Sequence, residues 1–463
     1  MYITPGKEFP VSLPSVDKPL KIAVIGSGVS GLACAWMLSR THRVSLFEKN
    51  GTPGGHSNTI DLDIDGRSLP VDTGFIVYNP LNYPNLVALF ELLNVPTRTT
   101  NMSFSISLDN GWMEYSGSGI AGLLAQKRNL LRPDFWRMVK DILRFYRQCP
   151  DYLEHAEYQN LSLGAFLEKE SFSAGFINNH LAPMGAAIWS CSQQDILDYP
   201  LKAFLAFFQN HGLTQLKNRP EWRTVSGGSR EYVQRMTKPF EDRLYLDTKV
   251  HGIRRLDDKV LIMSDRGDEI FDHVVLAGHA DDSLALLQDA TEPERNLLSA
   301  FPYQDNEAWV HGDLSLMPRR RAAWASWNYL GGRENKDGSS LCVTYWMNLL
   351  QSLPTERPVL VTLNPDREIR EELVWRKISY RHPLFDQRAL TCQRQLWSLQ
   401  GNRNTWYCGA WFGAGFHEDG LQSGLAVAEL LSGVPRPWCR PRQNARIGLQ
   451  DELTQRVVEG AGS

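Results

Sequence analysis

Three glycines near the start of the chain have the spacing that binds the phosphates of a dinucleotide. Gly26, Gly28 and Gly31 form the pattern G-x-G-x-x-G, with Ser27 and Ser30 between them. The first glycine permits a tight turn, the second lets the backbone approach a pyrophosphate, and the third allows close helix–strand packing. The start of that helix presents free N–H groups and the positive end of its dipole to the phosphates.

An acid and a second glycine pair then narrow the choice of dinucleotide. Glu48 ends the next apolar segment, where a carboxylate accepts hydrogen bonds from an adenosine ribose. The glycine pair that follows is typical of flavin enzymes rather than nicotinamide dehydrogenases, because it returns the chain to the pyrophosphate. The pattern therefore predicts FAD. From this stretch we expect at the cofactor Glu48, Lys49, Gly54, Gly55, His56 and Ser57.

The flanking segments predict the βαβ unit that such a site needs. Ile22–Ile25 has the composition of a buried parallel strand, Leu32–Ser39 of a helix and Val44–Glu48 of a second strand. The same glycine spacing recurs at Gly117–Gly122, but no buried strand precedes it and no strand ending in an acid follows. We interpret that second copy as a glycine-rich turn before a helix.

Later segments indicate a return to the same domain. Thr73 and Gly74 either pass near a flat ring or form an ordinary strand-end turn. Leu244–Val250 and Asp272–Gly278 have strand patterns, separated by a small antiparallel excursion. This order of elements resembles that of glutathione-reductase-like flavoproteins, in which Val250 would lay its backbone against the adenine.

The segment Thr405–Leu431 predicts a strand, a glycine-rich loop and an apolar helix. Acids at a helix start are explained by capping alone. The functional interpretation is that this helix points its N-terminus at the flavin and stabilises its reduced, anionic form. That interpretation places His417 near the isoalloxazine and, at the cofactor, Gly409, Glu418, Gly420 and Leu421.

Composition limits the other classes of function. With 463 residues and a net charge of −3, the chain is long enough for two domains and has no overall positive charge favouring nucleic acid. Seven cysteines with no C-x-x-C pair argue for a reducing compartment and against a zinc site, so we expect no metal. The first twenty residues lack the apolar segment of a signal peptide, and no run of eighteen apolar residues occurs. A cytoplasmic protein is expected.

One helical segment has both basic and aromatic residues. Between Lys127 and Arg147, seven lysines and arginines alternate with large apolar side chains such as Trp136 and Phe145. Such a helix can lie on an anionic membrane surface, which would place the protein on the inner face of the cell membrane. An ordinary solvated helix face over a packed core is the simpler explanation of the pattern.

A second insertion is rich in aromatic residues. Cys342–Asn348 and Val359–Leu363 predict strands that could line an apolar pocket, with Tyr345 on one face. Core packing is the simpler explanation for any single aromatic. Arg319–Arg321 either hold an anionic group or form a surface cluster.

These segments together resemble a known superfamily, that of flavin-containing amine oxidases, protoporphyrinogen oxidases and phytoene desaturases. The resemblance is strongest to FAD-binding oxidoreductases that are similar to the N-terminal part of plant cyclopropane-fatty-acyl synthases. It implies dehydrogenation of an acyl chain, such as desaturation beside a methyl branch in furan fatty acid formation, and association with a fatty-acyl methyltransferase. The segments that carry it are GSGVSGL, GGHSNT, DTGFIVYN, GAAIWS, SGGSREYV, LMPRRRAAWASWNY, VTYWMN, VTLNP and GFHEDGLQSGL.

The resemblance implies an α/β fold: a discontinuous Rossmann-like FAD domain of the glutathione-reductase/amine-oxidase type with an inserted α+β substrate domain. We expect the FAD domain at 20–80, 224–294 and 396–434, the substrate domain at 81–223 and 295–395, a flexible arm at 1–19 and a tail at 435–463.

The chain departs from the amine oxidases at two positions. Those enzymes pair a lysine with the flavin and cage the amine between two aromatic residues. After residue 300 only Lys336 and Lys377 occur, in contexts that indicate a loop and a surface helix, and Glu418-Asp419-Gly420 stands where the second aromatic belongs. Amine oxidation is therefore the second hypothesis, and a non-catalytic flavoprotein or lipid-binding partner of a methyltransferase is the third.

The preferred mechanism removes a hydride and a proton from a lipid acyl chain. The hydride goes to flavin N5, and a nearby side chain accepts the proton. The candidates for that base are His417, Glu418, His311 and Tyr345.

Overall fold

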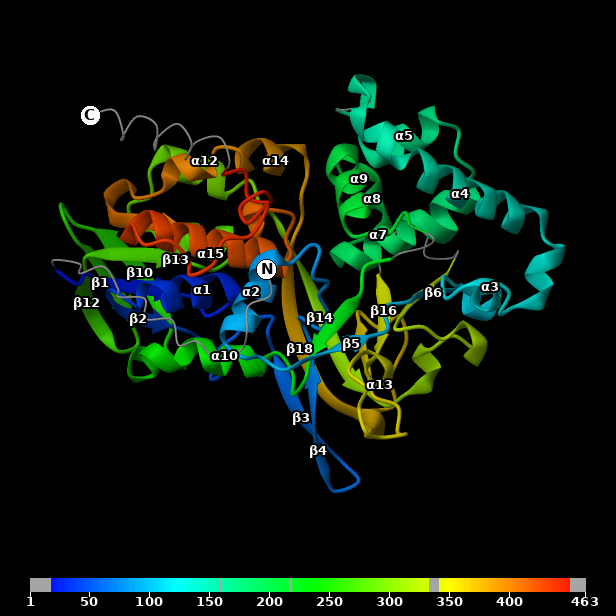
Figure 1. Cartoon of the computed structure of the whole chain (residues 1–463), viewed down its shortest axis with the longest axis horizontal. Coiled ribbons are helices and arrows are strands. Elements are labelled where there is room, and N and C mark those ends of the chain that lie inside the picture. The colour runs from blue at the N-terminus through cyan, green and yellow to red at the C-terminus, as the bar shows by residue number, and fades with distance from the viewer. Residues whose placement is uncertain (1–17, 159, 216–218, 333–340, 450–463) are drawn as a thin grey trace.

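The computed structural model describes residues 18–158, 160–215, 219–332 and 341–449 of the chain. A parallel sheet with helices on both sides forms one half, and a seven-stranded sheet with a group of helices forms the other (Figure 1). This arrangement confirms the predicted fold class, an FAD-domain architecture with an inserted α+β domain. The predicted arm lies almost entirely outside the described residues.

The parallel sheet is built from segments that are far apart in the sequence. Its order is β19 (Thr405–Tyr407), β13 (His273–Leu276), β1 (Lys21–Ile25), β2 (Arg43–Phe47) and β9 (Leu244–Tyr245). Buried apolar residues occupy the centre of β1, as expected for a strand covered on both faces. The helix after β1 starts earlier than predicted, because α1 (Val29–Leu38) begins directly after Gly28.

A three-stranded antiparallel sheet follows β9 in sequence. It contains β10 (Val250–Arg255), β11 (Val260–Ser264) and β12 (Gly267–Phe271). The strand predicted at Leu244–Val250 is thus two strands in different sheets. Asp247 separates them in the left-handed region, with φ of 47°. Such a backbone conformation cannot continue a strand.

The two predicted insertions share one sheet. β6, from the first insertion, pairs in parallel with β15, from the second. The chain also connects the two ends of the first insertion by pairing β5 (Thr97–Thr100) with β8 (Trp222–Val225). The seven-stranded order is β18 (Val374–Pro383), β14 (Tyr303–His311), β17 (Leu360–Leu363), β16 (Cys342–Trp346), β15 (Trp327–Gly331), β6 (Phe104–Leu108) and β7 (Met113–Ser116).

Helices cover both halves, and one hairpin projects from the molecule (Figure 1). That hairpin is β3 (Thr59–Ile64) with β4 (Arg67–Asp72). The predicted strand at Cys342–Asn348 ends at Trp346, where α13 begins. The helices are α2 (Pro84–Leu92), α3 (Ile120–Leu123), α4 (Pro133–Glu154), α5 (Leu163–Lys169), α6 (Ala174–Phe176), α7 (Ala182–Trp189), α8 (Gln193–Asp198), α9 (Leu201–Asn210), α10 (Arg230–Thr237), α11 (Ala280–Leu286), α12 (Glu292–Leu298), α13 (Met347–Leu350), α14 (Gln387–Gln393) and α15 (His417–Ser432).

The segment predicted as a C-terminal tail packs on the FAD domain as far as residue 449. Trp438 stacks on Trp36 of α1 with ring centroids 6.1 Å apart. Arg436 is buried and pairs with Glu429 at 2.6 Å. These contacts place the start of this segment against the FAD domain, and the one to Trp36 joins residues too far apart for a local sequence pattern to show it.

None of the described helices is both long enough and apolar enough to span a bilayer.

The contact between α1 and α15 depends on glycines. A Cβ on Gly424 would lie 2.1 Å from the carbonyl oxygen of Ser30, and one on Gly420 would lie 2.8 Å from the Ser30 hydroxyl. Moving backbone atoms in a packed core costs free energy. The two helices can therefore approach this closely only because neither position carries a side chain.

We predict that Gly424→Ala lowers the free energy of unfolding by about 1–3 kcal/mol or more, because the helices must separate to admit the methyl group. The measurement is the denaturant midpoint of the apoprotein. Gly175→Ala is the matched control, since its Cβ would meet nothing closer than 3.7 Å. That control should be neutral or stabilising by up to about 1 kcal/mol, and equal effects of the two substitutions would contradict the packing argument.

Candidate functional site

A single cavity of about 1310 Å³ runs from the first glycine loop into the inserted domain. Its volume exceeds the range usual for one small ligand, roughly 300–1,000 Å³, so it has room for a cofactor and a substrate. Of the residues predicted at the cofactor, the cavity is lined by Gly26, Ser27, Gly28, Ser30, Glu48, Lys49, Gly54, Gly55, His56, Thr73, Gly74, Val250 and Gly409.

The glycine loop leaves space where a pyrophosphate would bind. A Cβ on Gly28 would have no atom of the described residues within 4 Å, and none of their side chains caps the first turn of α1. The free N–H groups at this helix start therefore face the cavity, ready for an anion. Gly31 has a different role and does not line the cavity: its Cβ would lie 1.9 Å from the Gly26 carbonyl oxygen, so it allows the helix to pack on the loop.

Glu48 lies at the cavity and supports the loop. One carboxylate oxygen accepts hydrogen bonds from the backbone N–H and the hydroxyl of Ser27, at 3.0 and 2.6 Å. The other accepts from the backbone and side-chain amides of Asn50, both at 2.9 Å. A carboxylate held by four donors is fixed in position. Because these donors occupy its four lone-pair sites, a ribose hydroxyl would share an oxygen with one of them or displace it.

The second glycine pair brings the chain back to the loop, as predicted. A Cβ on Gly55 would lie 3.1 Å from the Cα of Gly28, and one on Gly74 would lie 2.3 Å from the carbonyl oxygen of His56. His56 stacks on Tyr380 with centroids 4.8 Å apart, and its Nε2 has no hydrogen-bond partner within the described residues. Burial holds the pKa of this imidazole well below its usual 6.5. A buried, unpaired polar atom on the cavity wall suits a bound group that supplies the missing partner.

The start of α15 opens on the cavity, and His417 is held there. Its ring stacks on Phe75 with centroids 3.8 Å apart. Its Nε2 lies 2.9 Å from the hydroxyl of Tyr232, which in turn donates to Ser57 at 2.5 Å. Burial lowers the pKa of His417 to about 3, so the imidazole is neutral at physiological pH.

Glu418, predicted both as a base and at the cofactor, points away from the cavity. Its carboxylate accepts from the backbone N–H groups of Asn85 and Leu86 at 3.0 and 3.1 Å, and from the Asn85 side chain at 2.8 Å. Glu418 thereby caps the start of α2. Burial raises its pKa, and the hydrogen bonds from Asn85 partly oppose that rise.

Other predicted site residues also lie elsewhere. His311 is fully buried in β14, where its Nε2 lies 2.7 Å from the hydroxyl of Thr362. It does not line the cavity, so it is removed from the candidates for the base. Ser57, Gly420 and Leu421, which were predicted at the cofactor, do not line the cavity.

The inserted domain provides an apolar chamber at the far end of the cavity. Its polar groups form a chain in which the Tyr115 hydroxyl donates to the Asn179 carbonyl at 2.7 Å and lies 3.0 Å from His180 Nδ1. Burial lowers the pKa of His180 to about 3. We define the apolar chamber by Met102, Phe104, Ile120, Leu123, Val139, Ile142, Leu143, Met184, Ile188 and Leu213.

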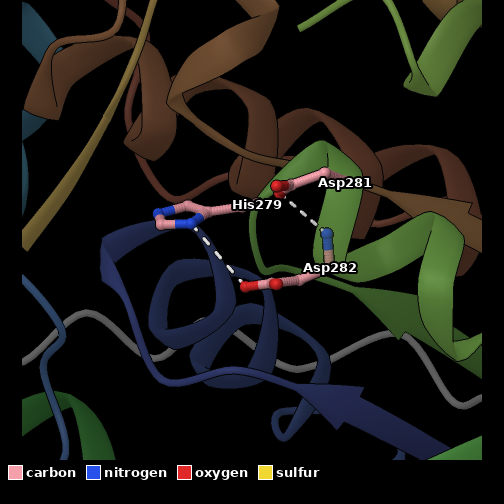
Figure 2. A group of neighbouring side chains, drawn as sticks. All are labelled: His279, Asp281 and Asp282. Carbon is pink, nitrogen blue, oxygen red and sulfur yellow. Dashed lines mark hydrogen bonds and ion pairs between the residues drawn. The ribbon is translucent and has the colours of Figure 1, made fainter. Parts of the chain in front are cut away.

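The acidic residues of the cavity wall are confined to the nucleotide end. They are Glu48 and Asp282, both in segments of the FAD domain. Figure 2 shows Asp282 with His279 at 3.7 Å and with Asp281, whose carboxylate accepts the Asp282 N–H at 2.8 Å. These three residues are close enough to share a metal ion, but Arg381 pairs with both carboxylates and balances their charge.

Several wall residues were not predicted from the sequence. Phe75, Trp411 and Phe416 line the cavity beside the predicted glycines, and Trp327 packs edge-on against Tyr345 at 4.9 Å. The signal available in the sequence was the mixture of aromatic residues and glycines at 409–416. Lys377 is exposed on β18 over the ring of Trp309, rather than on the surface helix we expected. Lys336 lies outside the described residues.

Comparison with known proteins places this geometry in context. The model of a family described as flavin containing amine oxidoreductase matches residues 29–304. A stretch of 45 residues is 51% identical to a 4,4'-diapophytoene desaturase (4,4'-diaponeurosporene-forming) of Staphylococcus aureus strain Newman. That stretch covers 10% of this chain and 9% of the relative, so the chain spans only a small part of the curated proteins that it matches.

Two solved structures show the same fold over nearly the whole chain. A CLA-producing fatty acid isomerase from P. acnes covers 90% of this chain and 99% of its own, with 16% identity and a TM-score of 0.62. A putrescine oxidase bound to putrescine covers 91% of this chain and 100% of its own, with 14% identity and a TM-score of 0.64. Identities this low establish the shared fold alone.

We predict that Gly28→Ala weakens FAD binding by about tenfold or more while leaving the apoprotein stable, because its methyl group would occupy the space for the pyrophosphate. The measurement is the ratio of flavin to protein absorbance after dialysis against limiting FAD. Gly31→Ala is the contrasting variant, since its Cβ would meet backbone at 1.9 Å and should destabilise the apoprotein itself. Undiminished FAD binding by Gly28→Ala would refute the assignment of the Gly26–Gly31 loop as the pyrophosphate site.

Proposed function

This chain belongs to the flavin-containing amine oxidoreductase family, and we propose that it uses FAD to dehydrogenate the acyl chain of a lipid. The substrate class in this proposal is a methyl-branched or unsaturated fatty acyl group of a phospholipid. The family and the fold support the coarser statement that the protein is an FAD-dependent oxidoreductase. When bound, FAD supplies a hydride acceptor.

Different residues of the cavity wall would contact the cofactor and the substrate. Gly28 and the start of α1 would hold the pyrophosphate, and Glu48 would hold the adenosine ribose. The start of α15, with Phe75 and His417, lies between the nucleotide loop and the apolar chamber. The reacting carbon of a substrate would therefore lie near His417.

The composition of the apolar chamber is the observation that carries the proposal. Its walls are aliphatic, aromatic and methionine side chains together with the Tyr115 hydroxyl and the His180 imidazole, and no carboxylate of the described residues lines it. A protonated amine entering this chamber would lose its hydration without gaining an anionic partner, which is costly. An acyl chain carries no charge to desolvate, and each CH₂ that it buries stabilises the complex by about 0.8 kcal/mol. This difference favours a lipid over an amine.

The names of the similar proteins favour a lipid substrate. The names of two of them refer to a diapophytoene and to a fatty acid, whereas that of the putrescine oxidase refers to a diamine.

His417 is the base in this proposal, since Glu418 and His311 face away from the cavity. Breaking two C–H bonds transfers one hydrogen as a hydride to the cofactor and releases the other as a proton. A neutral imidazole has a free lone pair to accept that proton. The hydrogen-bonded hydroxyls of Tyr232 and Ser57 would then orient the ring and share the positive charge.

The direct experiment is anaerobic addition of lipid to the oxidised holoenzyme. We predict that a methyl-branched phospholipid dispersed in detergent bleaches the flavin absorbance, whereas small aliphatic amines do not. Bleaching by amines alone would replace this proposal with amine oxidation. Tight lipid binding without any bleaching would replace it with a non-catalytic role, such as partner of a fatty-acyl methyltransferase.

For the proton acceptor, we predict that His417→Gln slows lipid-dependent bleaching by about 100-fold or more, because removing a general base typically costs a factor of 10² to 10⁴. Glutamine can keep the hydrogen bond to Tyr232, so FAD content should be unchanged. Tyr345→Phe is the matched control: it alters the other predicted base that lines the cavity and should bleach at nearly the wild-type rate. If Tyr345→Phe slowed the bleaching and His417→Gln bleached at the wild-type rate, Tyr345 rather than His417 would be the base.

A further inference from the structure

Exposed apolar side chains gather in one short part of the described chain. Of the ten large hydrophobic residues that are strongly exposed, five fall between residues 120 and 143. Leu131 and Ile120 are 86% and 77% exposed, respectively, which is unusual for side chains of this size. We call this surface the apolar edge, and it consists of Ile120, Leu130, Leu131, Trp136 and Leu143.

The apolar edge is surrounded by positive charge. Residues 117–147 contain seven lysines and arginines against two acids, although the whole chain has a net charge of −3. Some of these cations have structural partners: Arg128 donates to the Trp112 carbonyl, and Arg144 donates to the Glu170 carbonyl at 3.0 Å. The cations that are exposed and directed to solvent are Lys127, Arg137, Lys140 and Arg147, with Arg321 next to α3.

The geometry of α4 places the charge beside the apolar stripe. At 100° per residue, Trp136, Val139 and Leu143 lie along one side of the helix, and Lys140 and Arg147 lie on the adjoining solvent side. An apolar stripe bordered by basic residues matches the interface of an anionic bilayer, where apolar groups enter the acyl boundary and cations remain among the headgroups.

The same edge surrounds the mouth of the cavity. Ile120 on α3 and Leu143 on α4 are 77% and 47% exposed, and both line the apolar chamber. The two residues therefore stand at the opening. Figure 1 shows α3 and α4 at the side of the molecule farthest from the parallel sheet, so this surface is available while the FAD domain faces the solvent.

We propose that the apolar edge and its basic border dock on an anionic phospholipid bilayer, so that an acyl chain passes from the membrane between α3 and α4 into the chamber. The passage of the acyl chain rests on the proposed function, whereas the docking does not. An acyl chain that entered by this route would remain in apolar surroundings and would avoid the cost of crossing water.

Vesicle sedimentation tests the docking. The full-length holoenzyme should sediment with vesicles of phosphatidylcholine mixed with phosphatidylglycerol, and much less with phosphatidylcholine alone. Binding should weaken as salt is raised, because the headgroup attraction is screened. No binding to the anionic vesicles would overturn the proposal.

Two variants with matched controls locate the surface. Arg137→Glu combined with Lys140→Glu should lower the partition coefficient on anionic vesicles by about tenfold or more, and Leu131→Glu should lower it to a similar extent. The controls are Arg254→Glu, an exposed cation on β10, and Ile270→Glu, 50% exposed on β12, both remote from α3. If the variants and the controls lost vesicle binding to the same extent, the apolar edge would not be the docking surface.

Two further measurements separate the remaining outcomes. Analytical ultracentrifugation would show whether Leu131 instead joins two copies of the chain; a dimer lost in Leu131→Glu, without vesicle binding, would overturn the docking. Flavin bleaching by detergent-dispersed lipid should be the same in wild type and Leu131→Glu, since Leu131 does not line the cavity. Absence of bleaching in both, with vesicle binding intact, would reject the proposed function and leave the docking in place.

Discussion

The close approach of α1 and α15 is the constraint on which the site depends. Gly420 and Gly424 let the last helix of the FAD domain lie directly on the backbone of the first, at Ser30. This contact joins the two ends of a chain whose middle folds into another domain. It also sets the start of α15, and therefore His417, at a fixed distance from the phosphate loop that begins α1. A cofactor that spans both points needs that distance to be rigid.

The acids at the start of α15 show how the fold uses charge to hold this geometry. Asp419 is fully buried and pairs with Arg446 at 2.5 Å, from the segment that follows the helix. Glu418 satisfies the first amides of α2 instead. A buried charge pair adds little net stability, but removing one partner leaves the other unpaired at a cost of about 3–5 kcal/mol. Both acids thus orient three segments around the cavity without lining it.

The substrate end is organised differently, by one sheet made from two insertions. β6 and β15 bring residues more than two hundred positions apart into register. Helices α3, α4 and α7, with β6 and adjoining loops, supply the apolar chamber, and α4 contributes both to its wall and to the exposed edge. A single helix with one face toward the cavity and another toward solvent explains why basic and aromatic residues alternate along it. The apolar edge and the chamber are therefore two sides of one element.

The sequence by itself determined the cofactor half of this protein. The glycines at 26–31, Glu48 and the pair at 54–55 act through local backbone geometry, which is encoded by residues that are close together in the chain. It also indicated the basic, aromatic character of the helix at 133–154, although an ordinary solvated face over a packed core was the simpler explanation.

Only the tertiary structure decided which chemically suitable side chains face the cavity. His311 and His417 are both histidines in apolar surroundings, yet one is enclosed within a sheet beside Thr362 and the other opens on the site. Glu418 occupies a helix start, where a carboxylate has the same local pattern whether it meets a ligand or the amides of another helix. These outcomes depend on partners hundreds of residues away, and a local pattern carries no information about such partners.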